Sequence, residues 1–173
     1  MIFTSCNVLF LCTGNSARSI LAEAILERMG NDQFTAYSAG SFPRGEIHPA
    51  ALNLLKNLGH RTEHLRSKSW DEFTGASAPQ INFIFTVCDN AATETCPIWS
   101  GYPITVHWGL PDPAAVEGSD DDVTQAFTAT YQQLSKRIST FIQLANDSSD
   151  NTELRSRLVV TEPSIVQSTP ETF

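Results

Sequence analysis

The chain has no long hydrophobic run and few basic residues. No stretch of its 173 residues approaches the roughly 20 consecutive apolar residues of a membrane-spanning helix. Lysine and arginine together number 11 against 19 aspartates and glutamates, which gives a formal net charge of −8. An acidic surface disfavours nucleic acid and anionic membranes as partners. Any anion site must therefore rely on hydrogen-bond donors placed close to the anion.

Cysteine is also scarce, and its spacing is not that of a zinc site. The four cysteines include no closely spaced Cys-x-x-Cys pair: Cys6, Cys12, Cys88 and Cys96. We accordingly predict no bound metal and no cofactor. The first seven residues contain no basic residue, and the apolar segment 8–11 is too short for the core of a signal peptide. We expect a cytoplasmic protein whose cysteines are reactive or buried rather than joined in structural disulfides.

Apolar segments alternate with amphipathic ones along most of the chain. A continuous apolar run predicts a strand buried on both faces at residues 7–11, and further strands are predicted at residues 34–39, 83–87 and 104–108. Apolar residues at helical spacing predict helices at residues 19–29, 48–58, 119–144 and, as a short one, 69–73. This alternation indicates an α/β fold, a three-layer open parallel sheet of about four strands with helices on both faces.

The last part of the chain differs in composition from the rest. Residues 1–145 contain all the predicted strands and helices, and their number suits a single globular domain. Residues 146–173 are polar, with many Ser, Thr, Asp and Pro residues and no clear hydrophobic period. We predict that this segment is a disordered tail.

The segment most clearly suited to chemistry is the loop between the first predicted strand and the first helix. Open parallel sheets bind their ligands at the carboxyl ends of strands, which is where this loop lies. Its backbone N–H groups can surround an oxyanion, with Gly14 allowing the tight curvature. Arg18 supplies a planar fork for two oxygens of a tetrahedral anion. The predicted oxyanion-binding residues are Thr13, Gly14, Asn15, Ser16, Ala17, Arg18 and Ser19.

Cys12 lies at the bottom of this loop and is the predicted nucleophile. The inward N–H groups and the dipole of the following helix should favour its thiolate, while Asn15 and Ser16 or Ser19 can steady the loop by hydrogen bonds. The alternative is a buried cysteine followed by an ordinary Gly-Asn turn. The chain lacks the Gly-x4-Gly-Lys pattern of nucleotide-binding phosphate loops.

These residues resemble the signature of the low-molecular-weight tyrosine phosphatase fold and, within it, the arsenate reductase branch that is recycled through thioredoxin. The similarity is carried by Asn-Val-Leu-Phe-Leu-Cys-Thr-Gly-Asn-Ser-Ala-Arg-Ser from residue 7 and extends to about residue 142. Residues 37–40 (Tyr-Ser-Ala-Gly) and 66–69 (Arg-Ser-Lys-Ser) also look like family segments, although they are less specific.

The resemblance assigns the general acid to Asp112. Phosphatases and reductases of this fold place an Asp-Pro pair after the fourth strand, and a carboxyl group above an anion retains its proton more easily. The alternative is a turn-forming aspartate before proline. Tyrosine phosphatases carry aromatic residues after this pair and usually a second cysteine in the loop. Ala114, Ala115 and Ala17 stand there instead, which favours a small inorganic anion.

The resemblance also implies a disulfide relay through Cys88 and Cys96. Cys88 ends the third predicted strand, so a parallel neighbour would place it at the same sheet edge as Cys12. The seven residues between the two cysteines are one more than the family pattern, and a purely structural role for both is the alternative. Cys6 precedes the strand that Cys12 follows, about 20 Å away along an extended chain, too far for a disulfide.

Reductases of this family can hold a potassium ion behind the loop. Asn15, Glu23 and Ser38 match three of the ligand positions that the resemblance implies. Lys68 stands where an acidic ligand is expected, and its ammonium group could take the place of the ion. We therefore do not predict a bound cation.

Three functions are compatible with these residues. The first is reduction of arsenate to arsenite by Cys12 with the Cys88/Cys96 relay, with phosphate as a competitor and thioredoxin, or glutaredoxin with a low-molecular-weight thiol, as reductant. The second is hydrolysis of phosphate monoesters through a Cys12 phosphoenzyme, as in a low-molecular-weight tyrosine phosphatase. The third is a non-catalytic anion-sensing or interaction protein, with the acidic tail as its contact. The first two differ in their need for Cys88 and Cys96, which hydrolysis does not use.

Overall fold

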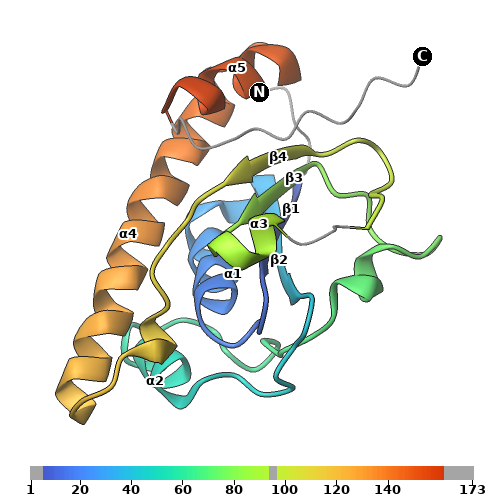
Figure 1. Cartoon of the computed structure of the whole chain (residues 1–173). Helices are drawn as coiled ribbons and strands as arrows, with labels where there is room; N and C mark the ends of the chain where they lie inside the picture. The colour runs from blue at the N-terminus through green and yellow to red at the C-terminus, as the bar shows by residue number, and fades with distance from the viewer. Residues whose placement is uncertain (1–5, 94–96, 162–173) are drawn as a thin grey trace.

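A computed structural model of the chain describes residues 6–93 and 97–161, and it contains one four-stranded parallel sheet (Figure 1). The strand order is β2-β1-β3-β4, and every neighbouring pair runs parallel. The strands are β1 (Cys6–Cys12), β2 (Phe34–Gly40), β3 (Phe83–Thr86) and β4 (Ile104–His107). All four strand predictions are confirmed. The central strands β1 and β3 are buried along almost their whole length, whereas the outer strands β2 and β4 are only partly buried.

The central strand β1 shows how the two faces of the sheet are buried. Val8 and Phe10 point into a core shared with α1 (Arg18–Met29) and α4 (Asp120–Asp147), with α2 (Pro49–Asn57) at its side. Leu9 and Leu11 point the other way, into a smaller cluster. That cluster is closed by the short helix η2 (Trp70–Phe73) and by loop residues such as Trp99. The expected three-layer α/β fold is confirmed.

The helices begin and end near their predicted limits. α1 ends before Gly30, and α2 begins at Pro49 in the first turn, as expected. Ser119 caps α4 in a capping box with Asp122, which satisfies backbone groups at the start of this long helix. The remaining short helices are η1 (Asn31–Gln33), α3 (Asp89–Thr93) and η3 (Pro113–Ala115).

The predicted disordered tail is wrong over part of its length. α4 continues to Asp147, and α5 (Asn151–Thr161) folds back against α4 and β4 (Figure 1). Leu154 and Leu158 from α5 belong to the larger core cluster. The sequence pattern missed this helix because two leucines four residues apart form only one turn of an apolar stripe. Residues 162–173 lie outside the described part of the chain.

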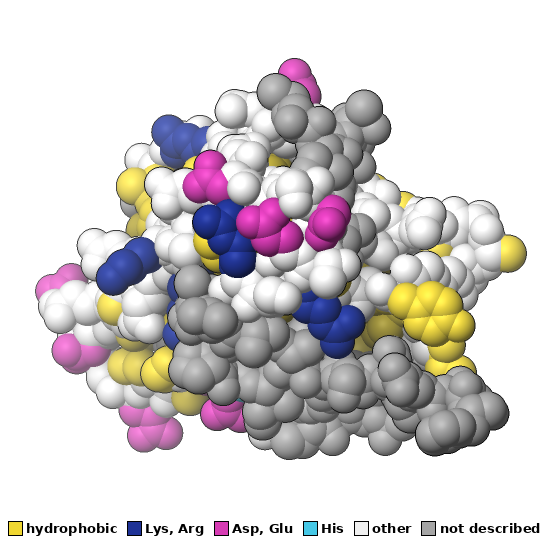
Figure 2. Space-filling model, turned by 90° about the horizontal axis from the view of Figure 1, so that it is seen from above, with side chains coloured by type: hydrophobic (Ala, Val, Ile, Leu, Met, Phe, Trp, Pro, Cys, Tyr) yellow, Lys and Arg dark blue, Asp and Glu magenta, His cyan; other side chains and the backbone are white. Residues whose placement is uncertain are grey.

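Charged side chains of both signs are interspersed over the face of the molecule seen from above (Figure 2). They form no basic patch among the described residues on that face, consistent with the acidic composition. Within residues 6–93 and 97–161, no helix combines the length and apolar character that crossing a membrane requires.

Replacement of Leu154 by alanine tests whether α5 is part of the domain. This side chain has no exposed surface, and a buried Leu→Ala change removes apolar burial and leaves a cavity, at a cost of about 2–5 kcal/mol. We expect the free energy of unfolding, measured by urea denaturation, to fall by that amount. Ser156→Ala, on the exposed side of the same helix, is the control. A Leu154→Ala protein as stable as this control would show that α5 does not contribute to the fold.

Candidate active site

The loop between β1 and α1 is shaped by hydrogen bonds to its outer side. Three of its carbonyl groups accept backbone N–H groups from the segment after β2: Thr13 from Phe42 at 3.0 Å, Gly14 from Arg44 at 3.0 Å and Ser16 from His48 at 2.9 Å. Carbonyls held outward in a tight loop leave neighbouring N–H groups free to face inward. Gly40 permits this close approach, because a side chain there would collide with the Thr13 carbonyl oxygen.

Asn15 is the residue that turns the loop. It has a φ of 41°, in the left-handed region that asparagine tolerates better than most residues. Its side-chain oxygen accepts the Lys68 backbone N–H at 2.8 Å, and its side-chain nitrogen donates to Ser19 Oγ and Ser38 Oγ, both at 2.9 Å. The sequence assigned the tight curvature to Gly14, whereas the structure gives the left-handed position to Asn15.

The Cys12 thiol lies at the base of the loop and is only 4% exposed. Its Sγ lies 2.9 Å from Ser19 Oγ and accepts the Asn15 N–H at 3.2 Å. Because Ser19 Oγ accepts a hydrogen from Asn15, the Ser19 hydroxyl hydrogen is available to Sγ. Burial raises the pKa of the Cys12 thiol, and the Ser19 and Asn15 hydrogen bonds lower it less strongly. The Ser19 and Asn15 hydrogen bonds are the local contacts expected to favour the thiolate, and burial opposes them.

A buried ion pair lies behind the loop. Lys68 Nζ is 3.5 Å from Glu23 Oε2 and 3.5 Å from Ser38 Oγ, and it donates to the Arg66 carbonyl at 3.1 Å. Lys68 is 7% exposed and Glu23 is 5% exposed, while Ser38 donates its hydroxyl hydrogen to Glu23. Burial raises the pKa of Glu23 and lowers that of Lys68, and each charge opposes the shift of the other. Because the ammonium group already contacts Glu23 and Ser38, this site does not fit an additional potassium ion.

Arg18 and Asp112 face each other across the mouth of the loop. Arg18 Nη2 lies 3.2 Å from Asp112 Oδ2, and Arg18 Nη1 donates to the Leu110 carbonyl at 2.8 Å. Asp112 also accepts the Ala114 N–H at 3.1 Å and so begins the short helix η3. Asp112 is therefore both a turn-forming aspartate before proline, which was the alternative to the general acid, and a residue whose carboxylate faces the loop.

Cys12, Arg18 and Asp112 line one cleft with a volume of about 240 Å³. Its other lining residues are Thr13, Gly14, Ser16, Ala17, Phe42, Arg44 and Asn90. The two alanines after Asp112-Pro113 do not line this cleft. The sequence-based expectation of a cleft without aromatic walls was drawn from these two residues. Phe42, 75% exposed, stands at the cleft instead. Neither Phe42 nor Arg44 carried a sequence signal, because a loop after a different strand places them there.

Cys88 follows β3 and lies buried beside the loop. Its Sγ is 3.8 Å from Thr13 Oγ1, and it accepts the Ala91 N–H at 3.3 Å. Its proximity to Cys12 also raises the pKa of the Cys12 thiol. β3 pairs directly with β1, so the topology brings the two thiols to the same sheet edge. Cys96 lies outside the described residues. Cys6 is buried at the opposite end of β1, where burial raises its pKa to about 11.

His107, at the end of β4, connects residues on both sides of Cys88. Its Nδ1 lies 2.8 Å from Thr86 Oγ1, and its Nε2 lies 3.1 Å from Asp89 Oδ1. Gly109 leaves room for this pair, because a side chain there would press on both Asp89 and the imidazole ring. Sequence reasoning missed His107, whose contacts depend on the pairing of β3 with β4.

A comparison with known families identifies the domain. The model of the low molecular weight phosphotyrosine protein phosphatase family matches residues 7–151. The chain belongs to this family. The family match extends past residue 145, the boundary expected from the sequence, and ends at the start of α5.

Relatives within the family include reductases and phosphatases. An arsenate reductase of Halalkalibacterium halodurans is 34% identical over 136 residues, which cover 79% of this chain and 94% of the relative. A thioredoxin-dependent arsenate reductase of Corynebacterium glutamicum has a similar structure, with a TM-score of 0.58, 23% identity and coverage of 82% of this chain and 63% of that one. The tyrosine phosphatase Wzb from Escherichia coli K30, in complex with sulphate, gives a TM-score of 0.61, 23% identity and coverage of 82% and 97%.

Lys68→Met tests the buried ion pair through the pH dependence of stability. Without the ammonium group, the Glu23 pKa should rise further in the folded protein. When the pKa of a carboxyl group is higher in the folded protein than in the unfolded chain, the protein keeps its stability at low pH. It loses stability as the pH rises through the folded-state pKa. The free energy of unfolding of Lys68→Met should therefore be only slightly lower than that of the unsubstituted protein near pH 5, and lower by about 3–5 kcal/mol near pH 8.

The measurement is the free energy of unfolding by urea at several pH values. Lys136→Met, which removes an exposed lysine from α4, is the control and should show little pH-dependent loss. A deficit for Lys68→Met that does not change between pH 5 and pH 8 would mean that Glu23 does not depend on Lys68 for its charge.

Proposed function

We propose that this chain reduces arsenate to arsenite, with Cys12 as the nucleophile and Cys88 as the thiol that releases the product. The observation that carries the proposal is the Cys88 thiol, buried beside the loop with its Sγ 3.8 Å from Thr13 Oγ1. Ester hydrolysis needs no second thiol at this place. The arsenate reductase of Halalkalibacterium halodurans, 34% identical over most of the chain, supports the same choice.

The first step uses the loop and the two residues at its mouth. The anion lies on the loop N–H groups, and Arg18 turns from Asp112 to hold two of its oxygens. The Cys12 thiolate attacks arsenic, while Asp112 donates a proton to the departing oxygen, which leaves as water. The product is an arsenate thioester on Cys12.

The second step transfers two electrons to arsenic. The Cys88 thiolate attacks Cys12 Sγ and forms a disulfide, the sulfur–arsenic electron pair stays with arsenic, and arsenite leaves with arsenic reduced from As(V) to As(III). Cys96 then attacks Cys88, which returns Cys12 as a thiolate and leaves a Cys88–Cys96 disulfide. A dithiol protein such as thioredoxin, or glutaredoxin with a low-molecular-weight thiol, reduces that disulfide. This chemistry suits the reducing cytoplasm, where we place the protein.

Phosphate-ester hydrolysis is the second candidate, and Phe42 favours it. An exposed aromatic ring at the cleft can contact an aryl group attached to a phosphate that lies on the loop. Hydrolysis would use Cys12, Arg18 and Asp112, with water releasing phosphate from a Cys12 phosphoenzyme. We expect it as a weak side activity, and we expect inorganic phosphate to compete with arsenate.

Cys12→Ser tests both candidate activities. Serine is not ionised at neutral pH, so the variant should release no arsenite and hydrolyse no p-nitrophenyl phosphate. Both products are measured on one preparation, with Cys6→Ser as the matched control, because Cys6 lies at the far end of β1. Arsenite release by Cys12→Ser at the rate of the unsubstituted protein would refute the assignment. Ester hydrolysis without arsenate reduction in the unsubstituted protein would favour the phosphatase.

Cys96→Ser and Cys88→Ser separate the later steps. Cys96 acts after arsenite has left, so Cys96→Ser should release about one equivalent of arsenite per protein and then stop. Peptide mapping without reduction should find Cys12 joined to Cys88. Cys88→Ser should stop earlier, with arsenic on Cys12, and both variants should retain ester hydrolysis. Sustained arsenate turnover by Cys96→Ser would instead mean that an external thiol attacks Cys12 or Cys88 directly.

A further inference from the structure

Arg44 stands at the mouth of the cleft in a position fixed by its backbone. Its N–H donates to the Gly14 carbonyl at 3.0 Å, and the next N–H, that of Gly45, donates to Ser67 Oγ at 3.1 Å. Gly45 has a φ of +81°, a conformation that glycine adopts without strain. The side chain then extends over Gly14, with Nε 3.4 Å from the point where a Cβ of residue 14 would lie. The Arg44 side chain thus lies in contact range of the loop at Gly14.

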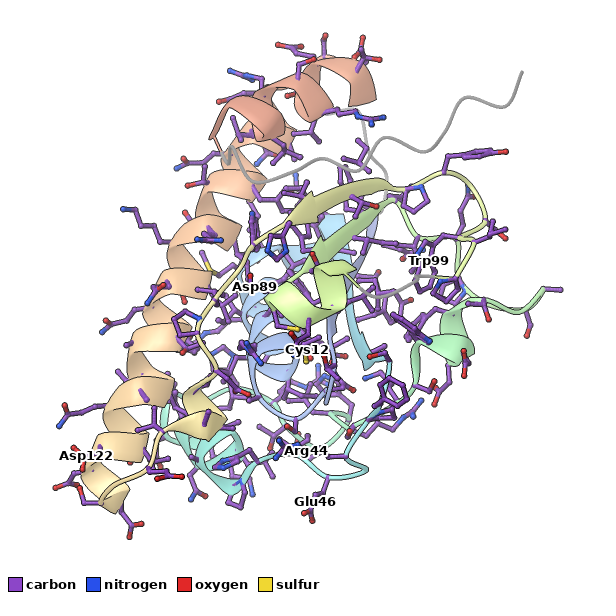
Figure 3. The ribbon with its side chains drawn as sticks, viewed as in Figure 1. Cys12, Arg44, Glu46, Asp89, Trp99 and Asp122 are labelled. Atoms are coloured by element: carbon purple, nitrogen blue, oxygen red, sulfur yellow. The ribbon has the colours of Figure 1, made fainter. Side chains whose placement is uncertain are left out.

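The charge of Arg44 is not neutralised within the described part of the chain. No acidic side chain in residues 6–93 and 97–161 forms an ion pair with it. Glu46, two residues further on, points away from the cleft, whereas Arg44 lies on the segment below Cys12 (Figure 3). Arg18, the other cation of the cleft, is paired with Asp112 at 3.2 Å. Among the described residues that line the cleft, Arg44 is therefore the cation without an acidic partner.

An acidic protein that binds an anion needs such a charge. The formal net charge of −8 repels arsenate and phosphate at long range. The local attraction must also arise before Arg18 leaves Asp112, because the pair offers little net charge to an approaching anion. A positively charged side chain at the rim meets both requirements through its charge.

We propose that Arg44 is a capture residue, which binds the incoming inorganic oxyanion at the cleft mouth and delivers it to Arg18 and the loop. This inference rests on the proposed function and adds a substrate-binding contact to it. Arg44 acts before the chemical step, so its charge should affect anion affinity and the capture rate while leaving the turnover number nearly unchanged. The charge, rather than the shape of the side chain, is the property that matters.

The test compares three variants at two ionic strengths. Arg44→Gln removes the charge and keeps the backbone hydrogen bonds, Arg44→Lys keeps the charge, and Arg61→Gln removes an exposed arginine that contacts Glu27 instead of the cleft. Binding of inorganic phosphate is measured by titration calorimetry, and kcat and kcat/KM are measured for arsenate. Phosphate binding requires no redox chemistry, so it tests Arg44 even if the protein proves unable to reduce arsenate.

We expect Arg44→Gln to weaken phosphate binding and lower kcat/KM by roughly 5- to 10-fold at low ionic strength, with kcat within about twofold. At about 1 M salt, where the screening length is near 3 Å, the difference should shrink to less than about twofold. Arg44→Lys and Arg61→Gln should stay near the unsubstituted protein at both ionic strengths. The proposal is overturned if Arg44→Gln binds phosphate normally, if Arg44→Lys is equally impaired, or if Arg61→Gln shows the same loss.

Discussion

The amide group of Asn15 is the interaction on which the site depends. It accepts a hydrogen bond from the Lys68 backbone and donates to the hydroxyl groups of Ser19 and Ser38. Because an amide has one acceptor side and one donor side, the first contact fixes the direction of the other two. Ser19 can then donate to Cys12, and Ser38 donates to Glu23. One side chain thus links the base of the loop, both neighbouring segments and the buried carboxylate.

The buried polar groups behind the loop, Asn15, Ser38, Glu23 and Lys68, are surrounded by apolar residues, and each relies on the others for its hydrogen bonds or its charge partner. A buried carboxylate or ammonium group is unfavourable alone, and Glu23 and Lys68 reduce that cost by lying 3.5 Å apart. Glu23 lies on α1, and its partners Ser38 and Lys68 come from two segments that the sequence marked only weakly, residues 37–40 and 66–69. The pair therefore ties α1, β2 and the segment before η2 to the same point behind the loop.

The fold and the centre of the site could be predicted because they follow from local pattern and strand order. The alternation of strand-like and amphipathic segments predicted the four strands, and the position of Cys12 between a strand and a helix marked the loop. Arg44, Phe42 and His107 could not be predicted, since their places depend on hydrogen bonds between segments distant in sequence. The left-handed turn at Asn15 was missed for a different reason: the adjacent Gly14 is the residue that usually adopts such a conformation.

The position of α5 has a consequence for how the protein behaves at high concentration. β4 is an edge strand of the sheet, and Leu154 and Leu158 pack into the same core as its apolar residues Ile104 and Val106. An edge strand whose apolar side is uncovered can pair with another chain and start aggregation. By packing over the apolar face of β4, α5 helps to keep Ile104 and Val106 out of an exposed apolar patch. Its contribution to solubility is separate from its contribution to folding, and it lies far along the chain from every residue of the cleft.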